Sequence, residues 1–475
     1  MSKMKFYLLL PMIAVMAFGS VSFAQSIDAE LRAELKAELK AELLAELKSE
    51  TKADIQEATV GLRDVLRADF KDEIRTEIMQ EDISSAVDDA IAGSAIMGGL
   101  FKGTTVTGFI DTNYMYNLRN SGNNATNRNA NSYVNFVGEN EDNSFTLENF
   151  AMFMDKEATD DHPIGWQMHT YWGEKTQGIT FFGPGNDNAA ADGARAQDRF
   201  SIAAANITWN APVLGKTVPI TMGKMYTWIG YELVENIGNP NYTHGMVYNN
   251  AIPFTHTGAS FDVSEFLPSD KWGLTLYVVN GWDSYIDNNE GKSFGAYLTY
   301  TPNDDFFISF ATINGPETSQ DGTAGFGGVK SDGTTANSSS NVFMYDVVMT
   351  YSLPQIDKLS LGFNWDHGRA KNNSATGNSA HWWGAVAYLM YDFTDNQQGA
   401  FRYEYFDDQD GAKGFGHSMW STTYTHNITV ADNLLLRPEI RHNKYNQDDV
   451  LTYGNRGDLT AESETILAMG VEYVF

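Results

Sequence analysis

The sequence predicts an all-β transmembrane barrel of about sixteen antiparallel strands, preceded by a long α-helical coiled coil. Three observations lead to this prediction. Residues 104–475 alternate apolar and polar side chains with a period of two, and the connections between the alternating segments are by turns long and short. Residues 25–95 instead repeat leucine every four positions. The first two patterns are typical of outer-membrane barrels, and the third is typical of a helical rod.

The composition excludes several classes of protein. The 475 residues include no cysteine, which excludes a disulfide scaffold, a thiolate metal site and a cysteine nucleophile. The formal net charge of −29 argues against a nucleic-acid partner, because phosphates are bound by lysine and arginine. Beyond the first two dozen residues there is no run of about 18 apolar residues, so no membrane-spanning helix is expected there.

Residues 1–24 have the pattern of an export signal. Lys3 and Lys5 form a basic start, residues 6–18 are almost wholly apolar, and small residues precede a cleavage point between Ala24 and Gln25. The alternative is a retained membrane anchor, but the apolar segment is short for one. The signal predicts that the protein leaves the cytoplasm of a bacterium.

Residues 25–95 read as one long helix that needs partner chains. Alanine, leucine, glutamate and lysine dominate, and all four are strong helix formers. A leucine stripe is flanked by glutamates on one side and lysines on the other, as in helices that pair between chains. The stripe comprises Leu31, Leu35, Leu39, Leu43 and Leu47. We expect a parallel periplasmic coiled coil roughly 100 Å long, followed by a glycine-rich joint at residues 96–103. The alternative is a single solvated helix.

The coil bears on the expected partners. A parallel coil adds an assembly element, and a homotrimer is expected, although the repeat does not separate three chains from four. A periplasmic or peptidoglycan partner for residues 25–95 is left open. The acidic surface of the barrel suits contact with outer-membrane lipids and lipopolysaccharide through divalent ions.

Residues 104–475 are predicted to form the barrel. In one segment Leu359, Leu361 and Phe363 alternate with Ser360 and Gly362, which places the apolar side chains on one face. The sixteen predicted strands lie near residues 104–117, 144–157, 164–173, 201–210, 217–226, 252–263, 271–281, 293–301, 305–314, 341–353, 358–368, 381–393, 397–407, 416–428, 433–443 and 463–475.

The connections predict the topology. Links after odd strands are mostly long and polar, such as 118–143 and 315–340, whereas links after even strands are short, such as 211–216 and 354–357. Long outer loops and short periplasmic turns mark barrels of the outer membrane of Gram-negative bacteria. An even strand number also leaves both barrel ends on the periplasmic side, where the coil joins. Sixteen strands enclose an aqueous lumen.

The chain ends with aromatic and apolar residues on one face, including Tyr473 and the terminal Phe475. This pattern resembles the terminal signal that the barrel assembly machinery of the outer membrane reads. We therefore expect that machinery to be a partner.

Two stretches resemble the OmpL-like β-barrel porin family of diverse Gram-negative bacteria. One is the opening strand 108–116 (GFIDTNYMY). The other runs from 222–232 (MGKMYTWIGYE) through 239–243 (NPNYT) to 251–258 (AIPFTHTG). The resemblance covers residues 103–475 and implies a general porin of unassigned solute. The N-terminal coil is similar to that of coiled-coil-bearing outer-membrane proteins that connect the outer membrane to deeper envelope layers.

The third long connection, residues 227–250, carries the candidate pore constriction. In general porins the corresponding loop folds into the barrel and narrows it. Acidic groups of the loop facing a basic ladder on the late strands set a field that favours polar solutes. The candidate residues are Tyr231, Glu232, Glu235, Arg402, Arg437 and Arg441. The alternative is that Glu232 and Glu235 lie in an exposed loop while Arg402 pairs with Glu404 and Arg437 with Glu439.

The sequence thus predicts an outer-membrane porin for passive diffusion of small hydrophilic solutes or ions, with a coiled-coil spacer that aids oligomerisation or tethering. The alternative is a mainly structural tether between the outer membrane and the periplasm or peptidoglycan. An enzyme is not expected, because no nucleophile, base and orienting group share a face within contact distance. No acidic cluster has the spacing of an EF-hand loop, and no metal site or cofactor is predicted.

Overall fold

The computed structural model describes residues 103–118, 143–176, 200–287, 289, 291–317, 341–371, 379–413, 415–446, 451–452 and 460–475. These residues belong to one compact unit that begins at Gly103. The predicted signal (1–24), the coiled coil (25–95) and all of the joint before Gly103 lie outside the described residues, so those predictions stay predictions.

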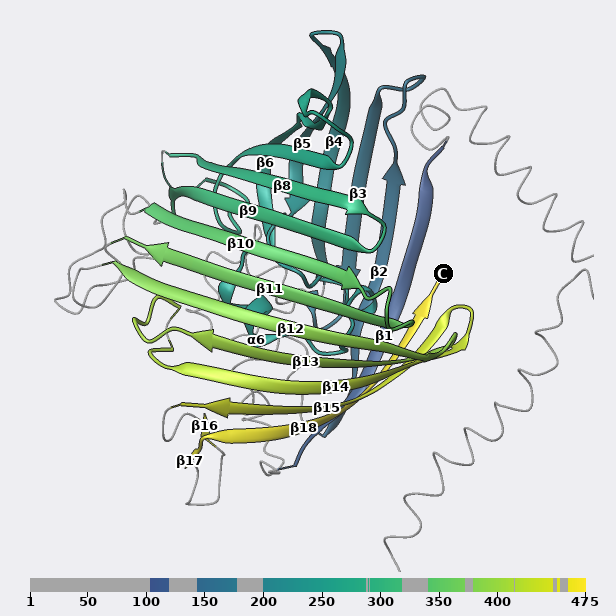
Figure 1. Cartoon of the computed structure of the whole chain (residues 1–475), viewed down its shortest axis with the longest axis vertical. Coiled ribbons are helices and arrows are strands. Elements are labelled where there is room, and N and C mark those ends of the chain that lie inside the picture. The colour runs from purple at the N-terminus through teal and green to yellow at the C-terminus, as the bar shows by residue number, and fades with distance from the viewer. Residues whose placement is uncertain are drawn as a thin grey trace, which may run out of the picture. The chain divides into compact units, whose positions relative to one another are not determined.

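Within the described ranges, sixteen antiparallel strands close into a barrel, which confirms the predicted fold (Figure 1). Each strand pairs with its neighbour in the sequence, and β1 pairs with the last strand, β18. The strands are β1 (Thr105–Asn117), β2 (Ser144–Lys156), β3 (Ile164–Trp172), β4 (Phe200–Val213), β5 (Lys216–Tyr226), β6 (Thr255–Asp262), β7 (Trp272–Val279), β8 (Ser293–Asn303), β9 (Phe306–Pro316), β10 (Asn341–Ser352), β11 (Leu359–Ala370), β12 (Ala380–Thr394), β13 (Gln397–Asp407), β14 (Ser418–Ala431), β15 (Leu434–Tyr445) and β18 (Ser463–Val474).

Two smaller features, a short β-ribbon and a 3₁₀ helix, were not predicted. β16 (Leu451–Thr452) and β17 (Thr460–Ala461) form a two-stranded ribbon in the connection between β15 and β18. A 3₁₀ helix, η2 (Ser264–Phe266), lies between β6 and β7. Neither feature changes the closed barrel.

The barrel closes where its first and last strands meet. Phe109 of β1 is paired with Val474 of β18. Gly108 donates its N–H to the carbonyl of Phe475 at 3.0 Å, and Phe475 donates back at 2.9 Å. The terminal residue therefore belongs to the sheet, and no strand edge remains exposed at this seam.

The two faces of the wall have opposite character. On β13, Phe401 and Tyr403 are each 44% exposed on the outside, whereas Arg402 and Glu404 are fully buried on the inside. A water-soluble protein shows the reverse, with apolar side chains buried and charges outside. An apolar exterior around a polar interior is what a barrel in a membrane requires.

One short turn is tighter than predicted. The turn between β4 and β5 consists of Leu214 and Gly215, with φ values of 51° and 78°, rather than the predicted 211–216. Two residues with positive φ form the hairpin turn that matches the natural twist of the strands, so residues 211–213 remain paired.

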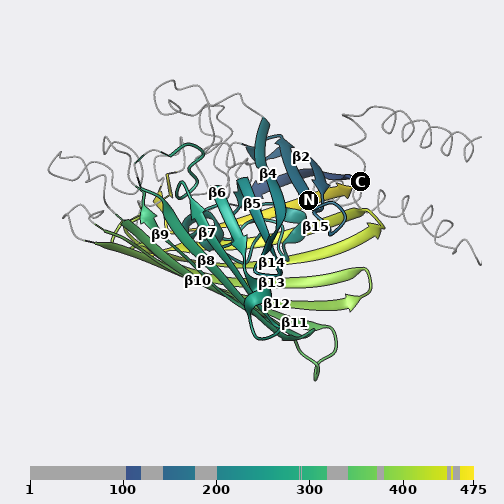
Figure 2. The ribbon, with the colours of Figure 1, turned by 90° about the horizontal axis from the view of Figure 1, so that it is seen from above.

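Seen from above, the consecutive strands follow one another around the wall (Figure 2).

Candidate functional site

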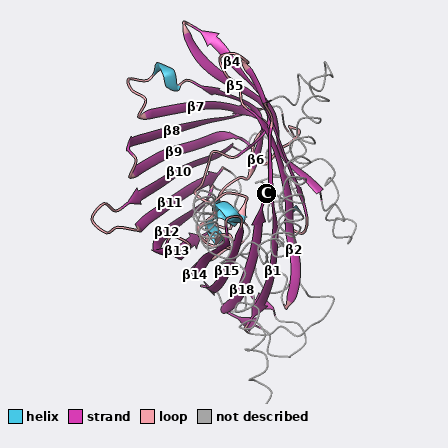
Figure 3. Cartoon of the chain, turned by 90° about the vertical axis from the view of Figure 1, so that its right-hand side faces the viewer, coloured by secondary structure: helices cyan, strands magenta, loops and turns pink. Residues whose placement is uncertain are grey.

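The connection between β5 and β6 folds into the barrel. This inward loop (residues 227–254) contains the 3₁₀ helix η1 (Asn236–Gly238) and the short helix α6 (Met246–Ala251). Helix α6 contacts β11, β12 and β13, and it lies inside the ring of strands (Figure 3). This inward path agrees with the expectation from general porins that the loop at this position folds into the barrel and narrows it.

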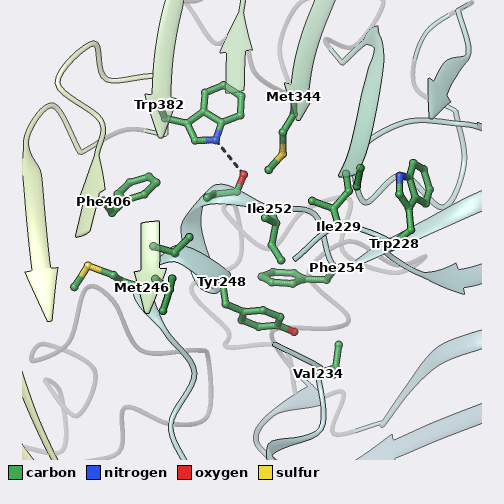
Figure 4. Packing of buried hydrophobic residues seen from close by; sticks show 14 of the residues in the cluster. Trp228, Ile229, Val234, Met246, Tyr248, Ile252, Phe254, Met344, Trp382 and Phe406 are labelled. Atoms are coloured by element: carbon green, nitrogen blue, oxygen red, sulfur yellow. Dashed lines mark hydrogen bonds between the residues drawn. The ribbon is translucent and has the colours of Figure 1, made fainter. Parts of the chain in front are cut away.

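Apolar side chains of the inward loop form a hydrophobic core within the lumen (Figure 4). The indole N–H of Trp382 donates to the carbonyl of Ala251 at 3.0 Å, which satisfies a backbone group at the end of α6. Burying these side chains away from water favours the inward path of the loop. The loop contributes Trp228, Ile229, Val234, Met246, Tyr248, Ile252 and Phe254, and the wall contributes Met344, Trp382 and Phe406 among others.

A buried ion pair ties the inward loop to β13. Arg402 donates to Glu232 at 2.6 Å and to the carbonyl of Thr243 at 2.7 Å, and Tyr388 donates to Glu232 at 3.0 Å. Burial raises the pKa of the Glu232 carboxyl, but the Arg402 guanidinium and the other donors lower it more, so the net pKa lies below its ordinary value. Glu232 is therefore a charged anchor at neutral pH.

Two further arginines hold the backbone of the inward loop. Arg437 of β15 donates to the carbonyls of Asn236 and Asn239 at 2.6 and 2.5 Å, and it pairs with Glu472 of β18 at 3.2 Å. Arg441 donates to the carbonyl of His244 at 2.6 Å. Both guanidinium groups are buried, and their donors are directed at backbone carbonyl oxygens of the inward loop.

The wall opposite β13, here called the facing wall, includes β1 and β3 and holds the other side of the inward loop. Tyr171 of β3 donates a hydrogen bond to Glu235, and Lys175 donates one to Asn236. Tyr242 donates to Asp111 of β1 at 2.9 Å. The inward loop therefore spans the lumen, with polar contacts on both walls.

The structure brings together most of the predicted site residues. Glu232 contacts Arg402 directly, and Tyr231 stacks on Tyr388 with ring centroids 4.3 Å apart. Arg437 and Arg441 contact the same loop from β15, whereas Glu235 of the loop contacts Tyr171 on the opposite wall. The alternative pairing holds in part, because Arg402 also approaches Glu404 at 3.4 Å.

The other alternative pair is not formed, because Arg437 pairs with Glu472 instead of Glu439. Glu439 accepts hydrogen bonds from the backbone N–H groups of Tyr242 and Thr243, at 2.8 and 3.2 Å. The sequence reasoning missed Glu439 as a loop anchor. The sequence did indicate that Glu439 faces the lumen, since it lies two residues after Arg437 on the same strand and therefore shares its face.

A cavity of about 620 Å³ lies between the inward loop and the short-turn end of the barrel. Its boundary includes Tyr231 and residues 237–240 of the loop. Asp392 and Asn427 on β12 and β14 contribute polar groups from the wall. This space is large enough for small hydrated solutes next to the loop.

Three ionisable side chains gather where the long connections leave the barrel. Asp283 accepts the N–H of Phe254 at 2.7 Å, Glu317 accepts the N–H of Trp282 at 2.6 Å, and Lys413 lies 4.5 Å from the centre of the Trp282 ring. Burial raises the pKa of Asp283 to about 6 and that of Glu317 to about 7, and it lowers the pKa of Lys413 to about 8. Of the three, Asp283 holds the outer end of the inward loop directly, through the N–H of Phe254.

Neither a membrane-spanning helix nor a metal-binding cluster occurs in the described ranges. Among the residues that the structure describes, no helix has the length and apolar character needed to cross a membrane. Within the same ranges, no group of three or more histidine, aspartate or glutamate side chains is arranged to hold a metal ion.

A closed sixteen-stranded barrel with an apolar exterior, a polar interior and an inward-folded loop defines the class of outer-membrane β-barrel porins. The chain belongs to the family described as putative beta-barrel porin-2, OmpL-like, whose sequence model matches residues 103–475. This is a porin family and not an enzyme family. The family resemblance of the barrel is thereby confirmed.

Several solved structures are similar to this chain. The anion-selective porin from Comamonas acidovorans has a TM-score of 0.48 and 10% identity, with 78% of this chain and 99% of that chain covered. The trimer form of OmpT from Vibrio cholerae has a TM-score of 0.44 and 11% identity, with coverage of 78% and 99%. OmpF of Salmonella typhi in complex with daunomycin has a TM-score of 0.48 and 12% identity, with coverage of 78% and 97%. No curated protein matches the sequence.

Proposed function

We propose that this porin allows passive diffusion of small hydrophilic solutes and ions through a lumen narrowed by the inward loop. The observation that carries the proposal is the buried ion pair between Glu232 of the loop and Arg402 of the wall. Its Oε1 and Nη1 atoms are 2.6 Å apart, and the pair fixes the loop across the lumen. A loop held on both walls reduces the open cross-section without closing the barrel ends. The cavity beside residues 237–240 supports the presence of a path for solutes.

Conductance tests the proposal and the constriction together. Purified full-length protein in planar bilayers is expected to give discrete single-channel steps. The double variant Glu232→Gln/Glu235→Gln removes the loop carboxylates that contact Arg402 and Tyr171, so we expect altered conductance and ion selectivity. Absence of channel steps contradicts the pore. Unchanged conductance and selectivity in the variant contradict a role for these two side chains.

The barrel is expected to reach its membrane through the assembly machinery, with the terminal residues as the signal. Phe475 is 47% exposed on the outer face, and its ring stacks on that of Phe150 with centroids 5.8 Å apart. Tyr473 is exposed on the same face. An exposed aromatic pair beside the closing seam is a surface that another protein or lipopolysaccharide-rich lipid can contact.

The coiled coil predicted for residues 25–95 is proposed as a periplasmic spacer and as an assembly element of a homotrimer. The leucine stripe and its charged flanks within residues 25–95 support this role. Deleting residues 26–92 while retaining the signal and the barrel is expected to change the distance between the outer membrane and the peptidoglycan layer. Electron micrographs of the envelope and cross-linking of the protein measure the two effects. Unchanged spacing, peptidoglycan association and oligomeric state contradict the spacer.

A further inference from the structure

The described lumen arginines do not present positive charge to water. Arg402, Arg437 and Arg441 are at most 1% exposed. Each donates to a backbone carbonyl of the inward loop, at distances of 2.5–2.7 Å. A guanidinium group that is buried and directed at carbonyl oxygens cannot bind a passing anion. The basic ladder therefore holds the loop instead of attracting negatively charged solutes.

Glutamates outnumber these arginines in the same part of the lumen. Glu439, for example, receives hydrogen bonds from the neutral donors Tyr242, Thr243 and Thr425. Buried charge in a low-dielectric wall is screened weakly, and its field is concentrated in the adjacent water-filled space. The lumen-face glutamates around the loop are Glu232, Glu404, Glu439, Glu464 and Glu472, all at most 5% exposed.

The facing wall has the same sign of imbalance. Lys175 contacts the inward loop there. Three carboxyl groups lie in the same contact region: Asp111 accepts from Tyr242, Glu148 from Asn113 and Glu235 from Tyr171. Both walls that hold the loop thus carry more acidic than basic side chains.

The cavity beside the loop adds acidic groups that face water. Asp392 is half-buried and accepts from the amide of Gln398 at 2.8 Å, and Asp395 is exposed in the turn that follows β12. Lys358 is the basic side chain on the same lining besides the buried Arg437. Amide groups of Asn427 and the neighbouring glutamines complete a lining whose oxygens can replace water around a cation.

We propose that the lumen selects for cations, and that Asp392 and Asp395 are the water-facing side chains that set this preference. The inference rests on the proposed function as a diffusion pore, and it names the class of solute that the pore favours. Inorganic cations and small organic cations of similar size share the chemistry that the carboxylates and amides recognise.

Reversal potentials of the full-length protein under a KCl gradient test the inference. The expected sign corresponds to a higher permeability for potassium than for chloride. A conducting pore with no preference, or with a preference for chloride, overturns the inference and leaves the proposed diffusion pore in place. A protein that forms no conducting pore overturns the proposed function itself, which is a different result.

A matched pair of variants locates the selectivity. Asp392→Asn/Asp395→Asn is expected to lower the potassium-to-chloride permeability ratio by about twofold or more, because it removes the water-facing carboxylates of the cavity. Asp304→Asn/Asp305→Asn removes the same number of carboxylates from the exposed turn between β8 and β9, and it is expected to have a clearly smaller effect. Equal effects of the two variants, or no effect of the first, overturn the assignment.

Discussion

Removing the inward loop is expected to raise the single-channel conductance by on the order of two- to fivefold. The loop crosses the lumen between β13 and β3, through the contacts of Glu232 with Arg402 and of Glu235 with Tyr171. A sixteen-stranded barrel is wide enough for an aqueous channel, so its conductance is limited by whatever occupies the interior. Without the loop, the wall alone sets the cross-section.

The inward loop can be deleted without disturbing the pairing of β5 and β6. Tyr226 and Thr255 are paired, and Thr227 donates its N–H to the carbonyl of Phe254 at 3.0 Å, so a two-glycine link replacing residues 229–252 can close the hairpin. Planar-bilayer recordings measure the conductance, and the shift in gel mobility on heating verifies that the barrel is folded. Leu233→Ser, at a position 53% exposed in the same loop, serves as a control with unchanged conductance. A folded deletion variant with the conductance of the parent contradicts the narrowing role.

The barrel could be predicted from the sequence because strand periodicity is a local property. The segment 397–407 was predicted as a strand with Arg402 facing the pore, and the structure has β13 with Arg402 inside and Phe401 outside. The side-chain period of two fixes both faces once one of them is apolar. The ends of strands were less certain, as at Leu214 and Gly215, because a tight turn depends on two backbone dihedral angles and not on hydrophobicity.

The candidate site was less accessible to sequence reasoning, because its contacts depend on the path of one loop. Nothing local in the sequence distinguishes Glu232, which reaches β13, from Glu235, which reaches the opposite wall. The same holds for the partner of Arg437, since Glu439 shares its strand face but Glu472 lies on the neighbouring strand. Pairing across the lumen is set by tertiary packing, and the alternation of side chains gives only the face.

Replacing Arg402 by methionine is expected to lower the free energy of unfolding by about 3–5 kcal/mol. Arg402 lies between Glu232 at 2.6 Å and Glu404 at 3.4 Å, and all three side chains are buried. Without the guanidinium, Glu232 loses its paired cation, Glu404 keeps only the more distant Arg441 at 3.7 Å, and the carbonyl of Thr243 loses its donor. Urea unfolding in detergent micelles, followed by tryptophan fluorescence, measures the loss.

Two further variants distinguish the loss of stability caused by breaking the ion pair from the loss caused by the arginine-to-methionine change itself. Arg369→Met makes the same substitution at an exposed position of β11 and is expected to change stability by well under about 1 kcal/mol. The double variant Arg402→Met/Glu232→Gln neutralises the carboxylate that loses its ion-pair partner, so it is expected to be more stable than Arg402→Met alone. If Arg402→Met is no more costly than Arg369→Met, the buried ion pair does not stabilise the inward loop. If the double variant recovers nothing, the cost of Arg402→Met comes from lost packing and not from unpaired charge, because only the electrostatic penalty is relieved when Glu232 becomes neutral.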